Sequence, residues 1–276
     1  MKDTKYKLYR TVKEILHPTI SKKNISDYLI LFENDLLPVQ VYYPKKVSNI
    51  SQVIIFIHGN FDVTECGEQY GEVVKEMSLK TDCLLISVDY KDIKLGYSKM
   101  LEDIYLVVKH IYTELLECGI DSSKILLMGD STGGHIVTMI QSKLLEDIPV
   151  KKCVLFYPTL SLEYFGTTKY SSITQNQDLN FNLINRLQKY YKKIISEDDM
   201  SNYSVFCRDS NIPKTLLFIG GVDCLKDENI DYCKMYDSIC SYVELPFLSH
   251  GFLKRLEKDE KKVIYDQIIK LLNEKK

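Results

Sequence analysis

Short apolar runs and amphipathic segments alternate along most of this chain. Apolar runs of strand length suit strands that are covered on both faces, as in a mostly parallel sheet. The predicted strands cover residues 53–57, 83–88, 124–128, 152–156, 215–219 and 242–245. The predicted helices between them cover residues 68–80, 98–117, 134–145, 227–238 and 257–273. This alternation predicts right-handed crossovers and an α/β fold, with a central sheet flanked by helices on both faces.

Some stretches depart from this alternation. Residues 25–32 and 39–43 are more amphipathic, and we predict that they form an antiparallel pair at the edge of the sheet. Residues 3–16 predict an amphipathic helix before the first strand. Residues 161–212 separate two core strands by about fifty residues, far more than a usual connection. Their aromatic content and a helical pattern over 181–195 favour an ordered cap over a disordered insert.

Charge and composition narrow the function classes. The chain has 36 basic and 38 acidic side chains, a formal net charge of -2, so no strong field attracts nucleic acid or an anionic membrane. Only four of the basic residues are arginines, the residue that phosphate and guanine recognition favours. No signal-like run and no stretch of about 20 apolar residues is found. We therefore expect a soluble, cytoplasmic protein that binds neither nucleic acid nor a membrane.

The eight cysteines do not predict a framework of disulfides. They are spread along the chain from Cys66 to Cys240, and two of them, Cys83 and Cys153, lie in apolar runs typical of a core. No Cys-x-x-Cys pair is present, so a structural zinc site is not expected. The sequence thus predicts a protein without a metal ion.

A glycine-rich segment follows the predicted strand 124–128 and begins a predicted helix. It reads Gly-Asp-Ser-Thr-Gly-Gly and places Ser131 at the centre of a G-x-S-x-G motif. In a strand-turn-helix context this motif exposes the serine hydroxyl above the sheet edge as a nucleophile. The amides and the dipole of the helix N-terminus would face the developing oxyanion. The alternative is a turn in which Ser131 only caps the helix.

The loop after strand 53–57 supplies a second part of the predicted site. It reads His58, Gly59, Asn60, Phe61. In this type of fold that loop provides backbone donors for an oxyanion hole. We predict donors from the amides of Gly59, Asn60 and Thr132, although His58 and Gly59 could also form an ordinary turn.

An acid and a histidine follow two later strands. Asp223 comes directly after strand 215–219, where its carboxylate could orient a histidine. Asp227 is the alternative acid, although Asp at that position could also begin the next helix. His250 follows the last predicted strand, so the order Ser131, Asp223, His250 is that of α/β-hydrolases.

As a set, these segments resemble the hormone-sensitive-lipase-like esterases of the α/β-hydrolase fold. The serine segment is close to that group's G-D-S-A-G-G, Asp89-Tyr90-Lys91 to its D-Y-R, and residues 223–228 to its D-P-L-x-D-E. His250 begins an H-G-F as in the family. The chain differs where the family has H-G-G-G, and Cys224 replaces a proline, so it is identified as a divergent member.

The resemblance implies an α/β-hydrolase fold as a single domain over residues 1–276. It also implies that segments of about 1–24 and 161–212 together cover the site as a cap. No organic cofactor is expected.

The combined evidence predicts a serine carboxylic-ester hydrolase for small soluble esters with short acyl chains. Ser131 would carry the acyl group, His250 would transfer protons, and Asp223 would orient His250. An amide hydrolase or an acyltransferase would use the same triad. A non-catalytic small-molecule binder is disfavoured because both Ser131 and His250 are present. The sequence leaves open whether the chain forms a homo-oligomer.

Overall fold

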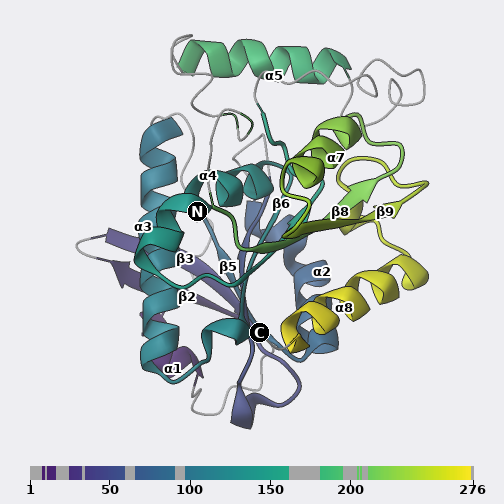
Figure 1. Ribbon diagram of the computed structural model, residues 1–276. Coiled ribbons are helices and arrows are strands. Elements are labelled where there is room, and N and C mark those ends of the chain that lie inside the picture. The colour runs from purple at the N-terminus through teal and green to yellow at the C-terminus, as the bar shows by residue number, and fades with distance from the viewer. Residues whose placement is uncertain are drawn as a thin grey trace, which may run out of the picture.

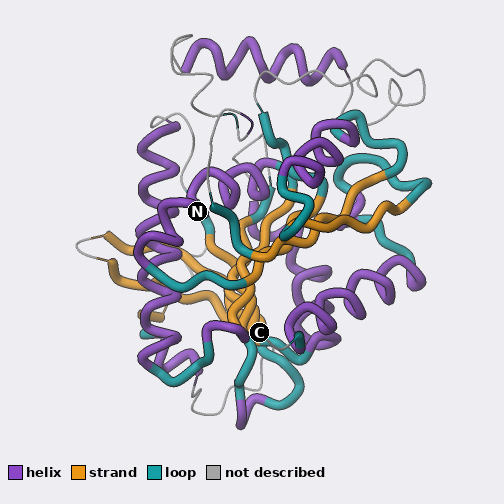
Figure 2. Tube along the Cα trace, viewed as in Figure 1, coloured by secondary structure: helices purple, strands orange, loops and turns teal. Residues whose placement is uncertain are grey.

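The computed structural model describes residues 8–9, 11–16, 25–32, 35–59, 66–90, 97–161, 181–194, 204, 206 and 211–274. A twisted sheet runs through the centre of the molecule with helices on either side (Figures 1 and 2). Within the described residues the sheet has nine strands in the order β1-β2-β3-β5-β4-β6-β7-β8-β9. These strands are β1 Leu8–Tyr9, β2 Ile25–Phe32, β3 Asp35–Tyr42, β4 Val53–Ile57, β5 Leu84–Val88, β6 Ile125–Asp130, β7 Lys152–Phe156, β8 Lys214–Gly220 and β9 Cys240–Leu245.

The strand directions confirm the predicted α/β-hydrolase fold. The six strands β5-β4-β6-β7-β8-β9, in their spatial order, are parallel to their neighbours. β2 and β3 form the predicted antiparallel pair, and β3 joins them to the sheet by an antiparallel pairing with β5. The central strands are fully buried, as their continuous apolar sequences require.

Helices cover both faces of the sheet. They are α1 Val12–Leu16, α2 Cys66–Thr81, α3 Tyr97–Glu117, α4 Thr132–Asp147, α5 Phe181–Ile194, α7 Lys226–Met235 and α8 Lys258–Asn273. One apolar core joins α1, α3, α4 and α7 to one face, and a second core joins α2 and α8 to the other. None of the helices in this described part of the chain is long and apolar enough to cross a bilayer.

The prediction of a helix over residues 3–16 was wrong at residues 8–9. Residues 8–9 form a strand that pairs with β2, so the described helix is limited to Val12–Leu16. This helix lies at the opposite end of the molecule from α5 (Figure 1), and the N–H of Val12 donates to Glu114 near the end of α3 at 2.9 Å. Its apolar side chains Ile15 and Leu16 are buried in the main core. The apolar side chains of this helix therefore contribute to the main core, and the part of the segment 1–24 in a cap stays a prediction.

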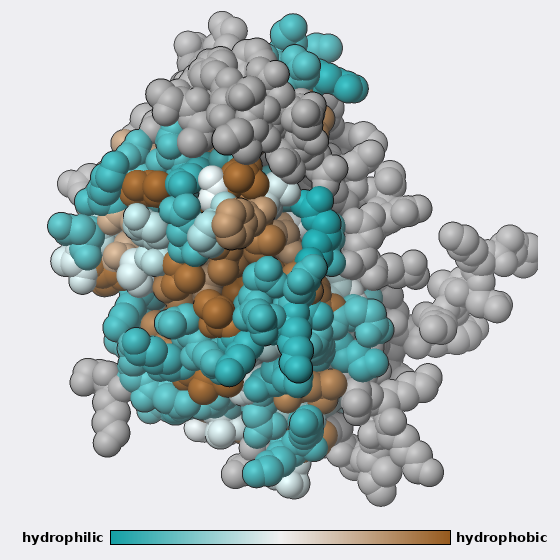
Figure 3. Space-filling view, turned by 90° about the vertical axis from the view of Figure 1, so that its right-hand side faces the viewer, coloured by the Kyte–Doolittle hydropathy of each residue, from teal (hydrophilic) through white to brown (hydrophobic). Residues whose placement is uncertain are grey.

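Two boundaries near the C-terminal end also differ from the prediction. α7 ends at Met235, short of residue 238, because the chain turns at residues 236–239 to enter β9. β9 begins at Cys240, which pairs with Thr215, and not at Tyr242. The polar Ser241 interrupts the apolar pattern there, since β9 is the edge strand and pairs on one side only. Apolar side chains gather near the middle of the face shown in Figure 3. Near this end of the chain, Met235 and Phe247 are exposed large hydrophobic residues.

Candidate active site

The turn around Ser131 has the sharp geometry that a nucleophile elbow requires. β6 ends at Asp130 and α4 begins at Thr132, so Ser131 is the single residue between them. Its φ of 50° lies in the region that side chains other than glycine rarely adopt, at a typical cost of about 1–3 kcal/mol. Gly133 allows this turn, because a Cβ there would overlap the carbonyl oxygen of Ile57 in β4. The predicted strand-turn-helix context is therefore present.

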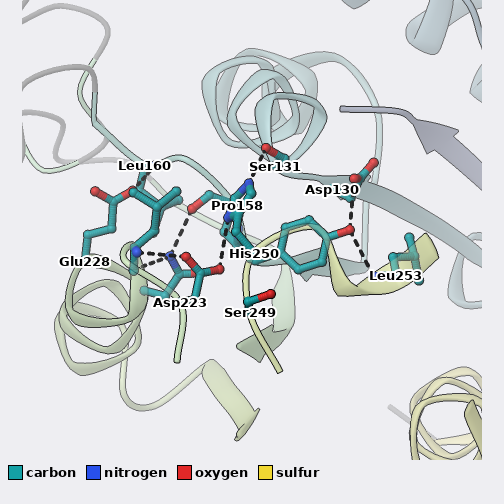
Figure 4. Close-up of polar contacts among 12 residues, drawn as sticks. Asp130, Ser131, Pro158, Leu160, Asp223, Glu228, Ser249, His250 and Leu253 are labelled. Atoms are coloured by element: carbon teal, nitrogen blue, oxygen red, sulfur yellow. Dashed lines mark hydrogen bonds and ion pairs between the residues drawn. The ribbon is translucent and has the colours of Figure 1, made fainter. Parts of the chain in front are cut away.

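The three predicted triad residues meet at the carboxyl ends of the strands. Ser131 Oγ lies 2.8 Å from His250 Nε2, and His250 Nδ1 lies 2.9 Å from Asp223 Oδ2 (Figure 4). Since a carboxylate only accepts, Nδ1 donates to Asp223, and Nε2 is left to accept the proton of Ser131. All three residues are less than 9% exposed, so solvent weakens these contacts little.

Asp223 is fixed from its other oxygen as well. The N–H of Leu225 donates to Asp223 Oδ1 at 2.9 Å, so both carboxylate oxygens have a donor. The alternative acid, Asp227, lies in the first turn of α7, while Asp223 is the acid beside His250. The sequence assignment of Asp223 thus agrees with the geometry.

The loop after β4 differs from the expectation. The N–H of Gly59 donates to Asp130 Oδ1 at 2.6 Å and is already engaged, so Gly59 does not supply a free oxyanion donor. The loop still lies against the serine turn, because a Cβ on Gly59 would come within 2.9 Å of Ser131 Cβ. Asn60 lies outside the described residues. Thr132 is the first residue of α4, so its N–H has no partner within the helix and its predicted role stays a prediction.

The buried side chains of His58 and His135 contact loops beside the site. The His58 ring stacks on Tyr90 with centroids 4.6 Å apart, and its Nε2 lies 3.3 Å from Asp89. The Tyr90 hydroxyl donates to the His58 carbonyl at 2.8 Å, which fixes the start of the loop after β4. His135 Nδ1 lies 2.9 Å from the carbonyl of Thr159. Both rings therefore hold loops around the site.

Sequence reasoning missed a residue beside the histidine. Tyr157 directly follows β7, and its ring meets the His250 ring edge to face with centroids 4.9 Å apart. Its position after a core strand adjacent to β6 was the available signal, because parallel strands end at the same edge of a sheet. Arg255 was also missed, and it donates from Nη2 to the His250 carbonyl at 2.6 Å.

One side of the site contacts the predicted cap. α5 confirms the helix expected over 181–195, and its Ile184 packs on Cys224 and Leu225. These two residues directly follow Asp223 in the chain. Apart from α5 and a few single residues, the rest of the predicted cap over 161–212 lies outside the described residues.

The described side chains do not gather into a metal centre. Within the described ranges, no group of three or more His, Cys, Asp or Glu side chains could hold a metal ion. The expected absence of a cofactor stays a prediction. The chemistry that the described contacts can carry is proton transfer from a serine hydroxyl to a histidine that a buried carboxylate orients.

Comparison with known proteins supports this assignment of the fold. The sequence model of the alpha/beta hydrolase fold matches residues 54–254. Arylacetamide deacetylase-like 3 of Mus musculus is 30% identical over 148 residues, which cover 52% of this chain and 36% of that protein. Carboxylesterase NlhH of Mycobacterium tuberculosis is 23% identical over 232 residues, 79% of this chain and 71% of that protein. The chain thus spans little more than a third of the first of these relatives.

Solved structures show the same architecture over nearly the whole chain. A hyperthermophilic esterase from the archaeon Pyrobaculum calidifontis has a TM-score of 0.77 at 21% identity, covering 95% of this chain and 88% of its own. The Francisella virulence factor BioJ has a TM-score of 0.78 at 21% identity, and the match covers 96% of this chain and 89% of that chain. These likenesses concern the fold, and together with the sequence match they confirm the resemblance drawn from the motifs. The chain belongs to the alpha/beta hydrolase fold family.

Proposed function

We propose that this protein is a serine carboxylic-ester hydrolase. The observation that carries the proposal is the continuous path of two hydrogen bonds from Ser131 through His250 to Asp223. The path ends at the buried carboxylate of Asp223, whose two oxygens accept hydrogen bonds from the Leu225 N–H and from His250. The printed names of the relatives, a carboxylesterase and arylacetamide deacetylases, support the same reaction class.

The proposed reaction begins with attack of Ser131 Oγ on the ester carbonyl carbon. His250 Nε2 takes the hydroxyl proton as the new C–O bond forms, and the carbonyl oxygen becomes an oxyanion. Asp223 stabilises the imidazolium through the bond to Nδ1. When the oxyanion collapses, the C–O bond to the leaving alcohol breaks, and the alcohol takes the proton from Nε2. Water then attacks the acyl carbon while His250 Nε2 takes one of its protons. The bond from Ser131 Oγ to the acyl carbon breaks, Oγ takes the proton from Nε2, and the carboxylic acid leaves.

The oxyanion would receive a hydrogen bond from the amide of Thr132 at the start of α4. Such a preorganised donor typically contributes about 3 kcal/mol to the transition state. We propose that a second donor comes from the loop after Gly59, where Asn60 was expected to contribute. Gly59 itself acts by holding that loop against Asp130.

We propose small soluble esters with short acyl chains as the substrates. The support is the sequence resemblance to esterases, together with the contact of Ile184 in α5 with Cys224 and Leu225, which directly follow Asp223. Amide hydrolysis is the second candidate, because the relatives named arylacetamide deacetylase act on amides by their printed name. Cytoplasmic location stays a prediction.

The test is a series of p-nitrophenyl esters of graded acyl length, run with the wild type and with Ser131→Ala. Ser123→Ala is the matched control, since Ser123 lies in the 3-10 helix Ser122–Lys124 directly before β6, at the other end of the strand from Ser131. We expect turnover with the wild type and the control, and loss of nearly all turnover with Ser131→Ala. Acetanilide, run beside p-nitrophenyl acetate, separates amide from ester hydrolysis. A well-folded wild type that cleaves none of the esters would contradict the proposal.

A further inference from the structure

A buried carboxylate joins two loops of the site. Asp130 is 1% exposed and directly precedes Ser131 in the chain. Its Oδ1 accepts the Gly59 amide at 2.6 Å, and its Oδ2 accepts the hydroxyls of Tyr70 at 2.8 Å and Tyr157 at 3.2 Å. Burial raises the pKa of Asp130, while the bonds from Gly59 and Tyr70 oppose that shift. These donors explain how a carboxylate is tolerated at this depth.

Tyr157 extends the network to the histidine loop, by which we mean residues 246–254. The Tyr157 hydroxyl accepts the N–H of Leu253 at 3.3 Å while it donates to Asp130 (Figure 4). Its ring also meets the rings of His250 and Phe252, with centroids 4.9 and 4.5 Å away. Burial and Asp130 raise the pKa of Tyr157, so its hydroxyl keeps the proton that it donates.

The backbone of Tyr157 is held in an unusual conformation. Its φ of 36° lies in the left-handed region, and its N–H donates to the Phe218 carbonyl in β8 at 2.8 Å. A residue other than glycine keeps such a conformation only where its surroundings enforce it, and such residues cluster at functional sites. Here the conformation accompanies a ring placed between Asp130 and the histidine loop.

Tyr70 makes the matching contact on the other side. Its hydroxyl lies 2.8 Å from Asp130 Oδ2 and 3.0 Å from the Gly59 carbonyl oxygen. It therefore fixes both the carboxylate and the loop after β4. The ring of Tyr70 also lies under Lys254 of the histidine loop, with Nζ 4.1 Å from the centroid. Tyr70 of α2 and Tyr157 at the end of β7 thus donate to the same oxygen of Asp130.

We propose that Tyr157 is a positioning residue for His250, and that it acts through Asp130 to fix the histidine loop relative to the loop after β4. Ester hydrolysis needs His250 and the oxyanion donors in place at the same moment, because both act on one tetrahedral intermediate. The Asp130 carboxylate accepts the Gly59 amide of the loop after β4 directly, and it contacts the histidine loop through the Tyr157 hydroxyl, so it couples the positions of the two loops. The inference rests on the proposed function, since it assigns a role within that reaction.

The kinetic test compares Tyr157→Phe, Tyr70→Phe and the double variant with the wild type. Each change removes one hydroxyl and keeps the ring packing. Tyr265→Phe is the matched control, because Tyr265 is a buried tyrosine of α8 whose hydroxyl has no hydrogen-bond partner among the described residues. We expect Tyr157→Phe to lower kcat about tenfold, the equivalent of one hydrogen bond, with KM nearly unchanged. Tyr265→Phe should leave kcat unchanged.

The double variant tests the coupling. Because both hydroxyls act through one oxygen of Asp130, the combined loss in kcat should be smaller than the product of the two single losses. A multiplicative loss would mean that the two tyrosines act independently, and it would overturn the coupling. Tyr157→Phe with kcat within about twofold of the wild type, a range below the typical effect of a lost hydrogen bond, would overturn the positioning role.

Amide hydrogen exchange supplies a measurement that does not depend on turnover. In Tyr157→Phe the Leu253 amide loses its acceptor, so peptides covering 250–254 should exchange faster. In Tyr70→Phe the same peptides should also exchange faster if Asp130 carries the coupling, and in Tyr265→Phe they should not. Should Tyr157→Phe fail to fold, Asp130→Asn tests the same link, and we expect it to produce the same faster exchange.

The two proposals fail separately. If the wild type cleaves no ester, the proposed function is wrong, and the exchange measurements still decide whether Asp130 couples the loops. If the wild type is active and Ser131→Ala is not, unchanged kcat and unchanged exchange in Tyr157→Phe contradict the positioning role alone.

Discussion

The change of Asp223 to Asn tests the acid assignment most directly. In the native site both oxygens of Asp223 accept a hydrogen bond, from the N–H of Leu225 at 2.9 Å and from His250 Nδ1 at 2.9 Å. An asparagine side chain has one oxygen and one NH₂ group, so it can satisfy only one of these two donors. The fold should persist, because the shape of the side chain is nearly unchanged.

The size of the effect depends on whether the asparagine oxygen accepts from His250 or from the Leu225 N–H. If the oxygen faces His250, the NH₂ group faces the buried Leu225 amide, and an unsatisfied buried donor costs about 1–3 kcal/mol. If the oxygen faces Leu225, the NH₂ group faces Nδ1, and the imidazole must carry its proton on Nε2. That tautomer cannot accept the Ser131 proton. The second arrangement avoids the penalty at Leu225, so we expect it to predominate and kcat to fall by roughly 10³- to 10⁴-fold.

The assay measures kcat and KM for a p-nitrophenyl ester, together with thermal unfolding, for Asp223→Asn and Asp227→Asn. Asp227 is the matched control, because it carries the same chemistry four residues further along and lies in the first turn of α7. Its change should affect activity little. A severe loss in Asp227→Asn combined with a mild one in Asp223→Asn would refute the argument.

Three further predictions concern the nucleophile, the turn and the substrate. A fluorophosphonate should label Ser131 in the native protein but not in His250→Ala, because the histidine activates the hydroxyl; mass spectrometry that finds the adduct on another serine would contradict this. Gly133→Ala should destabilise the fold in urea unfolding, because its Cβ would overlap the carbonyl of Ile57, whereas Gly71→Ala in α2 has room and should not. Within the series from acetyl to hexanoyl esters, kcat/KM should first rise and then fall, with each methylene that fits the pocket contributing up to ~0.8 kcal/mol of binding free energy. A steady rise to palmitoyl would indicate a lipase.

The fold was predictable wherever burial alone decides the pattern. β4 and β7 have the predicted bounds, because each is covered on both faces and reads as a continuous apolar run. The pattern is less informative where burial is partial. Residues 8–9 form a short edge strand, and β9 is an edge strand that begins with two residues outside the apolar run. At edges, pairing on one side replaces full burial, so hydrophobicity does not mark the boundary.

The site was predictable where a residue type has a fixed chemical role. Ser131, Asp223 and His250 could be named because each is the reactive group of a motif at the end of a strand. The engagement of Gly59 by Asp130 could not be predicted, because it depends on which way the amide points after the loop folds. The role of Tyr157 could not be predicted for a related reason. Its role rests on contacts with residues 27 and 96 positions away in the chain, which no local motif records.

The order of strands in the sheet explains why Tyr157 lies beneath the histidine. β6, β7, β8 and β9 are consecutive neighbours, so the segments bearing Ser131, Tyr157, Asp223 and His250 leave the sheet in that spatial order. With strands ~4.8 Å apart, β9 lies about 14 Å from β6, and the histidine loop must fold back across two strand ends to reach Ser131. Asp223 lies at the first of these ends and Tyr157 at the second. The loop therefore contacts the acid at His250 Nδ1 and the Tyr157 ring beside it. Tyr157 at the end of β7 thus contacts the returning loop, and its hydroxyl also joins that loop to the carboxylate beside the nucleophile.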